Sequence, residues 1–148
     1  MPQSSAIRRP RHLNAATFVA VAVIALAGLF GSLAQAQTSK RVVKEGNALG
    51  HAVLTNKQGL TLYSLSAEVH GRFICKGSCL KDWHPLVVAR GVKPTGPVAL
   101  GTVKRPDNGM RQVTFKGKPL YTFDGDSRKG QANGEGFEDV GTWHTAKP

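Results

Sequence analysis

A short pattern that occurs twice most constrains how this chain of 148 residues can fold. Gly-x-x-Leu-Tyr stands at residues 59–63 and again at residues 117–121. Each copy is followed, about twenty residues later, by a Trp-His pair, at residues 83–84 and 143–144. The repetition predicts one structural unit that is written twice in the chain.

The residues around both patterns alternate between apolar and polar side chains, as β-strands do. Residues 48–55 and 60–65 flank a polar turn, and residues 98–104 and 110–115 flank an Asn-Gly corner that favours a hairpin. Only residues 75–83 have helical character, over barely two turns. The sequence predicts a mainly β fold: two related β-hairpin-based repeats in one small domain, one short helical turn near the cysteines, and an N-terminal signal peptide.

Residues 1–36 have the three-part layout of a secretory signal. Three arginines precede an apolar run of 16 residues (15–30), and Ala34-Gln35-Ala36 offers small residues to a signal peptidase. A membrane anchor is the alternative, but a spanning helix needs about 20 residues. No cysteine lies near the cleavage site to carry a lipid. We expect a periplasmic or secreted protein with no stable membrane anchor after cleavage.

The part beyond the leader divides by composition. Residues 37–47 are polar and charged, which predicts a lead-in that docks as an edge strand. Residues 48–146 are predicted to form the two-copy domain, with copy 1 at about 48–90 and copy 2 at about 98–146. Residues 91–97 hold two prolines and two glycines, so they are predicted as the seam between the copies.

The chain is strongly basic, with 20 Lys and Arg against nine Asp and Glu. Cleavage removes three arginines and no acidic residue, so the net charge falls from +11 to +8. Nucleic acid is a poor candidate partner, since the protein is exported and its aromatic residues do not interleave with basic ones. The charge serves solubility, and it also favours attraction to the anionic polymers or lipids of a cell envelope.

The chain has two cysteines, Cys75 and Cys79. In an oxidising compartment an even pair so close in sequence predicts a disulfide. A thioredoxin-like pair needs two intervening residues, not three, and covalent haem attachment needs a histidine directly after the second cysteine. A zinc or copper site is the remaining alternative, with His70 and His84 as further ligands.

Several segments resemble a bacterial secreted-repeat family whose members are often described as predicted lipoproteins of unknown function. The run Tyr121-x-Phe123-x-x-Asp126 fits its Tyr-x-[Phe/Trp/Tyr]-x-x-Asp signature, and residues 75–86 and 105–121 are similar to two further segments. The resemblance implies a secreted or periplasmic repeat domain without an established activity. This chain lacks the lipid-attachment cysteine of many relatives, so we expect it to be soluble.

Copy 1 departs from the signature that copy 2 keeps. Leu65 stands at the position of the aromatic residue and Glu68 at that of the aspartate. If the aspartate binds a ligand, this departure predicts a weakened site in copy 1.

The aromatic residues of the motif are predicted to pack together. Tyr121 and Phe123 share one face of a strand because side chains alternate by twos. The expected core comprises Tyr63, Trp83, Tyr121, Phe123 and Trp143. A surface on which carbohydrate or other rings stack is the alternative, since aromatic side chains serve both purposes.

Asp126 lies at the end of a predicted strand, where a carboxylate commonly accepts nearby backbone N–H groups. It could instead bind a cation. Asp124, Asp126 and Glu135 match positions 1, 3 and 12 of an EF-hand loop, but Arg128 and Lys129 stand where an oxygen ligand and a glycine are required. The calcium interpretation is therefore disfavoured.

His84 and His144 are equivalent in the two copies, and a pseudo-twofold axis could bring them together on copper, zinc or haem iron. Strand alternation argues against this, because an inward tryptophan turns the next residue outward.

No standard catalytic motif is present, so the leading hypothesis is a non-enzymatic module that binds a small ligand, a protein or an anionic polymer of the envelope. A metal- or haem-linked redox accessory is the first alternative. The second is a cell-wall-acting enzyme, for which Asp126 with Glu138 or Asp139 is the only carboxylate pair worth testing.

Overall fold

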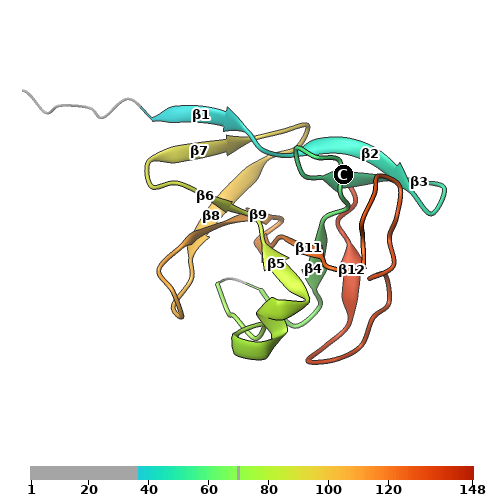
Figure 1. Cartoon of the computed structure of the whole chain (residues 1–148). Coiled ribbons are helices and arrows are strands. Elements are labelled where there is room, and N and C mark those ends of the chain that lie inside the picture. Colours follow the sequence, from blue (N-terminus) through green and yellow to red (C-terminus); the bar gives the residue numbers. More distant parts are fainter. Residues whose placement is uncertain (1–36, 70) are drawn as a thin grey trace, which may run out of the picture. The chain divides into compact units, whose positions relative to one another are not determined.

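The computed structural model describes residues 37–69 and 71–148 (Figure 1). The predicted signal peptide, residues 1–36, and His70 lie outside the described residues. The described chain is mainly β, as the sequence predicts, and carries one 3-10 helix, η1 (Gly77–Lys81). Its strands are β1 (Thr38–Arg41), β2 (Lys44–Ala48), β3 (His51–Thr55), β4 (Tyr63–Leu65), β5 (Trp83–Pro85), β6 (Val87–Val88), β7 (Val92–Thr95), β8 (Leu100–Lys104), β9 (Arg111–Phe115), β10 (Lys118–Pro119), β11 (Tyr121–Phe123) and β12 (Trp143–Thr145).

The two copies are built in the same order. Each begins with an antiparallel hairpin, β2–β3 in copy 1 and β8–β9 in copy 2. Each continues with a tyrosine strand, β4 or β11, and ends with a tryptophan strand, β5 or β12. The β8–β9 hairpin also pairs with β10 and β6, while β1 pairs with β7 in parallel (Figure 1).

Matched backbone hydrogen bonds show how closely the copies correspond. Leu62 N–H donates to Leu54 in copy 1 at 2.8 Å, and Leu120 N–H donates to Val113 in copy 2 at 2.9 Å. The bonds from the residue after each tryptophan strand match as well, Ala146 to Leu62 and Leu86 to Leu120. The repeated sequence therefore folds into a repeated backbone.

The copies do not fold side by side; they exchange strands. One sheet has the order β12-β4-β11-β5, with the two tyrosine strands at its centre and Tyr63 opposite Tyr121. The tryptophan strand of copy 1 pairs with β11 of copy 2, and that of copy 2 pairs with β4 of copy 1. Each copy therefore completes the sheet of the other.

The aromatic residues of the motif lie in the centre of this exchange. Trp83 and Trp143 are fully buried, and their rings stack 3.7 Å apart at 8° between planes. Tyr63 packs edge-on against Trp83, and Tyr121 against Trp143. A second apolar cluster lies under the hairpins and contains Val42, Val43, Leu54, Leu62, Val113, Leu120 and Ala146.

The structure extends copy 1 further toward the N-terminus than the polar composition indicates. Strand β1 docks along the edge of β7, as expected for a lead-in, but Val42 and Val43 are buried in the second cluster. Residues 44–48 form β2 and pair with β3 across a tight turn in which Leu49 and Gly50 both have positive φ, as a two-residue hairpin requires. The outward side chains of β2 are polar, which hides the strand in the sequence.

Two other segments differ from expectation. The predicted seam, residues 91–97, contains β7, which pairs with β1. The predicted helical segment, residues 75–83, is a 3-10 turn that ends at Lys81, and Trp83 already belongs to β5. Trp83 takes the extended conformation because it pairs with Phe123.

The loop between β11 and β12 is only partly exposed. Gly134 is buried against the tryptophan core, and a Cβ there would lie 2.6 Å from Trp83. Only glycine fits this close approach, so a residue in a loop that the sequence predicts as exposed in fact helps to close the core.

Candidate functional site

The two tyrosines and the acids that follow them form a pair of reciprocal hydrogen bonds between the copies. The Tyr63 hydroxyl donates to Asp126 Oδ2 at 2.5 Å, and the Tyr121 hydroxyl donates to Glu68 Oε2 at 2.8 Å. Each acid lies five residues after the tyrosine of its own copy and accepts from the tyrosine of the other. We call each tyrosine–carboxylate pair a clamp.

The second oxygen of each carboxylate holds the loop that follows it. Asp126 Oδ1 accepts the N–H of Asn133 at 2.9 Å. Glu68 Oε1 accepts the N–H groups of Ile74 and Cys75 at 2.6 and 2.7 Å. Glu68 is fully buried, and the longer glutamate takes the same place as Asp126 and accepts one more bond. The weakened ligand site in copy 1 stays a prediction.

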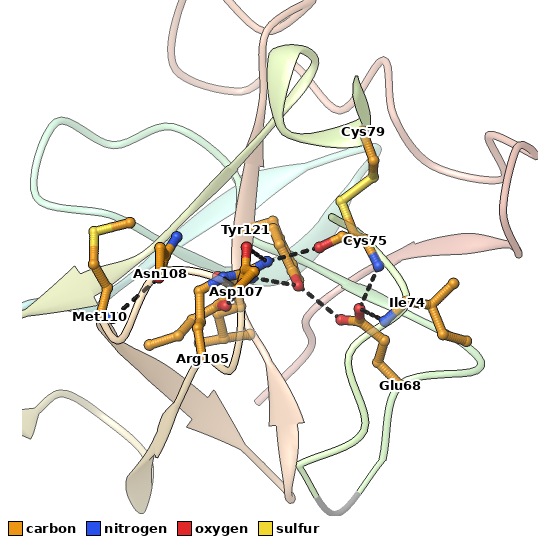
Figure 2. Close-up of polar contacts among 11 residues, drawn as sticks. Glu68, Ile74, Cys75, Cys79, Arg105, Asp107, Asn108, Met110 and Tyr121 are labelled. Carbon is orange, nitrogen blue, oxygen red and sulfur yellow. Dashed lines mark hydrogen bonds and ion pairs between the residues drawn. A yellow bond between two sulfur atoms is a disulfide. The ribbon is translucent and has the colours of Figure 1, made fainter. Parts of the chain in front are cut away.

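A buried arginine joins the Glu68 clamp (Figure 2). Arg105, which begins the β8–β9 turn, is fully buried, and its guanidinium donates to the Tyr121 hydroxyl at 3.1 Å. The same group donates to Gln112 at 2.7 Å and to the Cys75 carbonyl at 2.7 Å. Two further bonds of 3.0 Å go to Asp107, which leads toward solvent. Every N–H group of the guanidinium thus has an acceptor.

The clamps shift the proton affinities of their members. Burial and the neighbouring Asp126 carboxylate raise the pKa of Tyr63 far above its ordinary value. Burial and Glu68 likewise raise the pKa of Tyr121, although Arg105 opposes the shift. Burial alone would raise the pKa of Asp107, but Arg105 outweighs it and lowers that pKa. Both tyrosines therefore stay protonated and serve as donors, which suits a structural lock.

The disulfide between Cys75 and Cys79 is present, as the sequence predicts. It closes the η1 turn next to the Glu68 clamp, with Cys75 fully buried (Figure 2). The backbone of Cys75 both donates to Glu68 and accepts from Arg105. The disulfide therefore fixes the segment through which the buried acid and the buried arginine are held together.

The two tryptophans differ in their polar contacts. Trp143 Nε1 donates to Asp139 at 2.9 Å. Trp83 Nε1 is buried and has no hydrogen-bond partner. The residue four positions before Trp143 is Asp139, whereas Cys79 stands four positions before Trp83. In copy 1, a disulfide-bonded cysteine therefore occupies the position at which copy 2 has the aspartate that accepts the indole N–H.

The histidines lie on the edge strands of the central sheet, His84 on β5 and His144 on β12. Both side chains are about half exposed and face away from the tryptophan core; His84 contacts Asp124 at 3.4 Å, and His144 contacts Glu135 at 3.0 Å. In the residues that the structure describes, no group of three or more His, Cys, Asp or Glu side chains is arranged to hold a metal ion. The metal or haem alternative stays a prediction.

The predicted acidic sites are dispersed. Asp124 is largely exposed, Asp126 is buried in its clamp, and Glu135 binds the backbone and hydroxyl of Thr145. Burial alone would raise the pKa of Glu135, but its hydrogen bonds to Thr145 and the neighbouring His144 outweigh burial, so the pKa is lowered. The three side chains thus have separate partners and do not form a calcium loop. Asp139, proposed as a catalytic partner of Asp126, instead accepts the Trp143 indole.

The surface over β6–β9 carries a basic groove, which we define by Arg90, Lys104 and Arg111. These residues line one cavity of about 440 Å³, and Arg90 and Arg111 also line a neighbouring cavity of about 360 Å³ together with Lys93. Neither cavity is lined by an acidic residue. In the described part of the chain none of these four basic residues forms an ion pair.

Residues 101–147 match a family described as a secreted repeat of unknown function. The matched span runs from β8 to just beyond β12, so it contains the Asp126 side of the clamp pair and Trp143. This match to the secreted-repeat family confirms the resemblance seen in the sequence and agrees with export.

No curated protein and no solved structure shows significant similarity to the chain. The described residues contain no helix with the length and apolar character of a membrane span.

Sequence reasoning missed Arg105, Gln112 and the role of Glu68. Arg105 starts a predicted hairpin turn, where an arginine is normally exposed, and nothing in the local pattern marks it as buried. The one available signal is the spacing: Glu68 follows Tyr63 by the same five residues that separate Asp126 from Tyr121. An acid kept at that position despite the altered motif indicates a shared role.

Proposed function

We propose that the protein is an exported, non-enzymatic binding module that holds an anionic polymer of the cell envelope in the basic groove. The observation that carries this proposal is the cluster of Arg90, Lys104 and Arg111 around one cavity without any acidic lining residue. A surface hollow of one charge sign concentrates the electrostatic potential and attracts counter-ions. The family match, a secreted repeat, supports an envelope setting for such a partner.

The basic residues of the groove are placed where they destabilise the sheet beneath them. Lys104 and Arg111 lie directly opposite each other on the antiparallel strands β8 and β9. Like charges in this position destabilise a sheet, by a few tenths of a kcal/mol to about 1 kcal/mol. In the core, the buried tyrosine hydroxyls each have a carboxylate acceptor. By contrast, Lys104 and Arg111 have no acidic partner within the described residues. A bound anion would remove this repulsion.

The extent of the groove favours a polymer over a single small anion. The two cavities share Arg90 and Arg111, so anionic groups bound in each would be neighbours along one path. Arg111 is oriented by a hydrogen bond to the Thr102 hydroxyl at 3.1 Å. Two arginines also suit phosphate or carboxylate groups, which accept paired N–H donors from a guanidinium.

The test measures binding of linear polyphosphate and of polyglutamate to the mature protein by titration calorimetry, with neutral dextran as the control polymer. Exposed ion pairs contribute up to about 1 kcal/mol each, so the triple variant Arg90→Gln, Lys104→Gln, Arg111→Gln should weaken binding by at least tenfold. Binding should also fall as salt rises, since exposed charges are screened.

A matched variant separates the groove from net charge. Arg72→Gln, Lys81→Gln, Arg128→Gln removes the same three charges from exposed positions outside the groove. It should weaken binding by less than threefold. Equal losses in the two triple variants would show that net charge alone attracts the polymer, and the proposed groove would be rejected.

A further inference from the structure

A second groove, with apolar side chains on one side and polar ones on the other, lies next to the basic one. It is a cavity of about 280 Å³ walled by residues 86–89, Val42 and Val92, with Lys40, Lys57 and Gln58 at its polar side. Val92 lines both this groove and the basic one, so the two share a border. The lining residues come from strands β1, β6 and β7 and from the turn that precedes β4. Strand β1 pairs with β7, and β6 pairs with β9.

The apolar walls are not explained by the core alone. Val88 and Leu86 pack against the second apolar cluster with part of their surface. Val87, its neighbour on β6, lines the same groove and stays 40% exposed. Burying an aliphatic side chain of this kind stabilises a complex, so an open hollow lined by valines is suited to a hydrocarbon partner.

The charges at the rim specify what kind of hydrocarbon. Lys40 and Lys57 line the groove, no acidic residue does, and neither lysine forms an ion pair within the described residues. A partner with an apolar chain and a negative end would complement both parts at once. A neutral or cationic chain would leave the two ammonium groups uncompensated.

We propose that this groove binds the acyl chain of a single anionic amphiphile, whose carboxylate or phosphate headgroup is held by Lys40 and Lys57. At about 280 Å³ the groove lies near the lower limit of ligand pockets, roughly 300 Å³, so it has room for the end of a single chain. This groove and the basic groove are lined by different basic residues, so binding of an amphiphile can be tested independently of polymer binding.

The test titrates the mature protein with dodecanoate, kept below its micelle concentration, and follows the backbone NMR signals of β1, β6 and β7. We expect saturable shifts in those strands. Dodecyltrimethylammonium, which has the same tail and the opposite charge, should bind at least fivefold more weakly. Each methylene that enters the groove strengthens binding by up to about fourfold, so decanoate should bind more weakly than dodecanoate.

Variants locate the chain and the headgroup separately. Val87→Glu should weaken dodecanoate binding at least tenfold, whereas Val140→Glu, at a valine that is 47% exposed on another loop, should leave it within twofold. If Val87→Glu fails to fold, Val87→Ser serves in its place. Lys40→Gln with Lys57→Gln should abolish the preference for dodecanoate over its cationic counterpart.

Three results would overturn the proposal. They are equal binding of the anionic and cationic amphiphiles, equal loss in the Val87 and Val140 variants, or binding to anionic phospholipid vesicles without saturable binding of free dodecanoate. The last result would assign the surface to a membrane and not to an individual amphiphile. Polyphosphate binding, measured on Val87→Ser, which adds no charge, should remain at the level of the unaltered protein.

Discussion

The two clamps occupy equivalent places but are built from different parts. In copy 2, Asp126 is a short acid that accepts one hydroxyl and one backbone N–H. In copy 1, Glu68 is longer, accepts one hydroxyl and two backbone N–H groups, and is joined through Tyr121 to the buried Arg105. The disulfide, the 3-10 turn and Arg105 all belong to the Glu68 side.

This contrast shows that the duplicated unit conserves a connection and not a residue. The connection is a carboxylate that ties the loop of its own copy to the tyrosine of the other, and both copies keep it. Because the acid and the tryptophan strand of each copy bind the tyrosine strand of the other, neither copy has a complete sheet alone. The contacts between the copies are therefore the interior of the domain.

The largest effect is expected from Arg105→Met, which removes the cation from the Glu68 side. Breaking a buried charge network leaves its partners unpaired and typically costs about 3–5 kcal/mol. Glu68, Gln112 and the Cys75 carbonyl would all be affected. Urea unfolding gives the change in free energy. Arg90→Met, at an exposed arginine, should change it by less than about 0.5 kcal/mol.

A loss below about 1 kcal/mol for Arg105→Met would mean that the arginine is replaceable by apolar packing, as some buried ion networks are. The two clamps would then be energetically alike, despite their different composition.

The second prediction concerns alkaline pH, where both clamps act together. Both tyrosines of the chain are buried beside a carboxylate, and both have a raised pKa in the folded state. Their contribution to stability is fully present below the unfolded value of about 10 and is lost as pH rises toward the folded pKa. Each tyrosine should lower the free energy of unfolding by about 1.4 kcal/mol per pH unit above that point.

The measurement is the absorbance of tyrosinate during an alkaline titration, followed together with circular dichroism. We expect no tyrosinate before the protein unfolds, and both residues to ionise with unfolding. Tyr63→Phe should halve the pH slope. Ionisation of either tyrosine while the sheet remains intact would contradict the clamp.

The third prediction compares the hydroxyl groups one at a time. A hydrogen bond to a charged group contributes about 1.5–3 kcal/mol. Tyr121→Phe should lie at the upper end of that range, because the Tyr121 hydroxyl bonds both Glu68 and Arg105, whereas the Tyr63 hydroxyl bonds the single acid Asp126. Equal losses in thermal or urea unfolding would show that Arg105 adds nothing to its clamp. The double variant tells whether the clamps are coupled, since independent sites add within about 0.5 kcal/mol.

Much of this fold follows from local sequence, because the twofold pattern, the strand alternation and the turn residues act at short range. Gly-x-x-Leu-Tyr and Trp-His mark the four strands of the central sheet. The sequence does not show that β5 and β12 cross to the opposite copy, since that choice depends on which strand edges remain free once the hairpins form.

The candidate sites were less predictable for the same physical reason. Whether Arg105 is buried depends on acceptors that come from residues 75, 107, 112 and 121, far apart in the sequence. The β2 strand was hidden because its exposed side chains are polar, and only Ala48 is buried. The basic groove combines Arg90 with Lys104 and Arg111 across three segments, which a net charge cannot locate.

The most local effect is expected from removing the disulfide, which only copy 1 has. Cys75→Ser with Cys79→Ser should cost about 2 kcal/mol, because a loop this short constrains the unfolded chain little. The loss should be local: amide exchange should rise in η1 and at Ile74, whose N–H is held by Glu68, while Asn133 in copy 2 keeps its protection. Uniform loss of protection in both copies would instead show that the disulfide secures the whole domain, and that the Asp126 clamp cannot hold its half of the sheet without it.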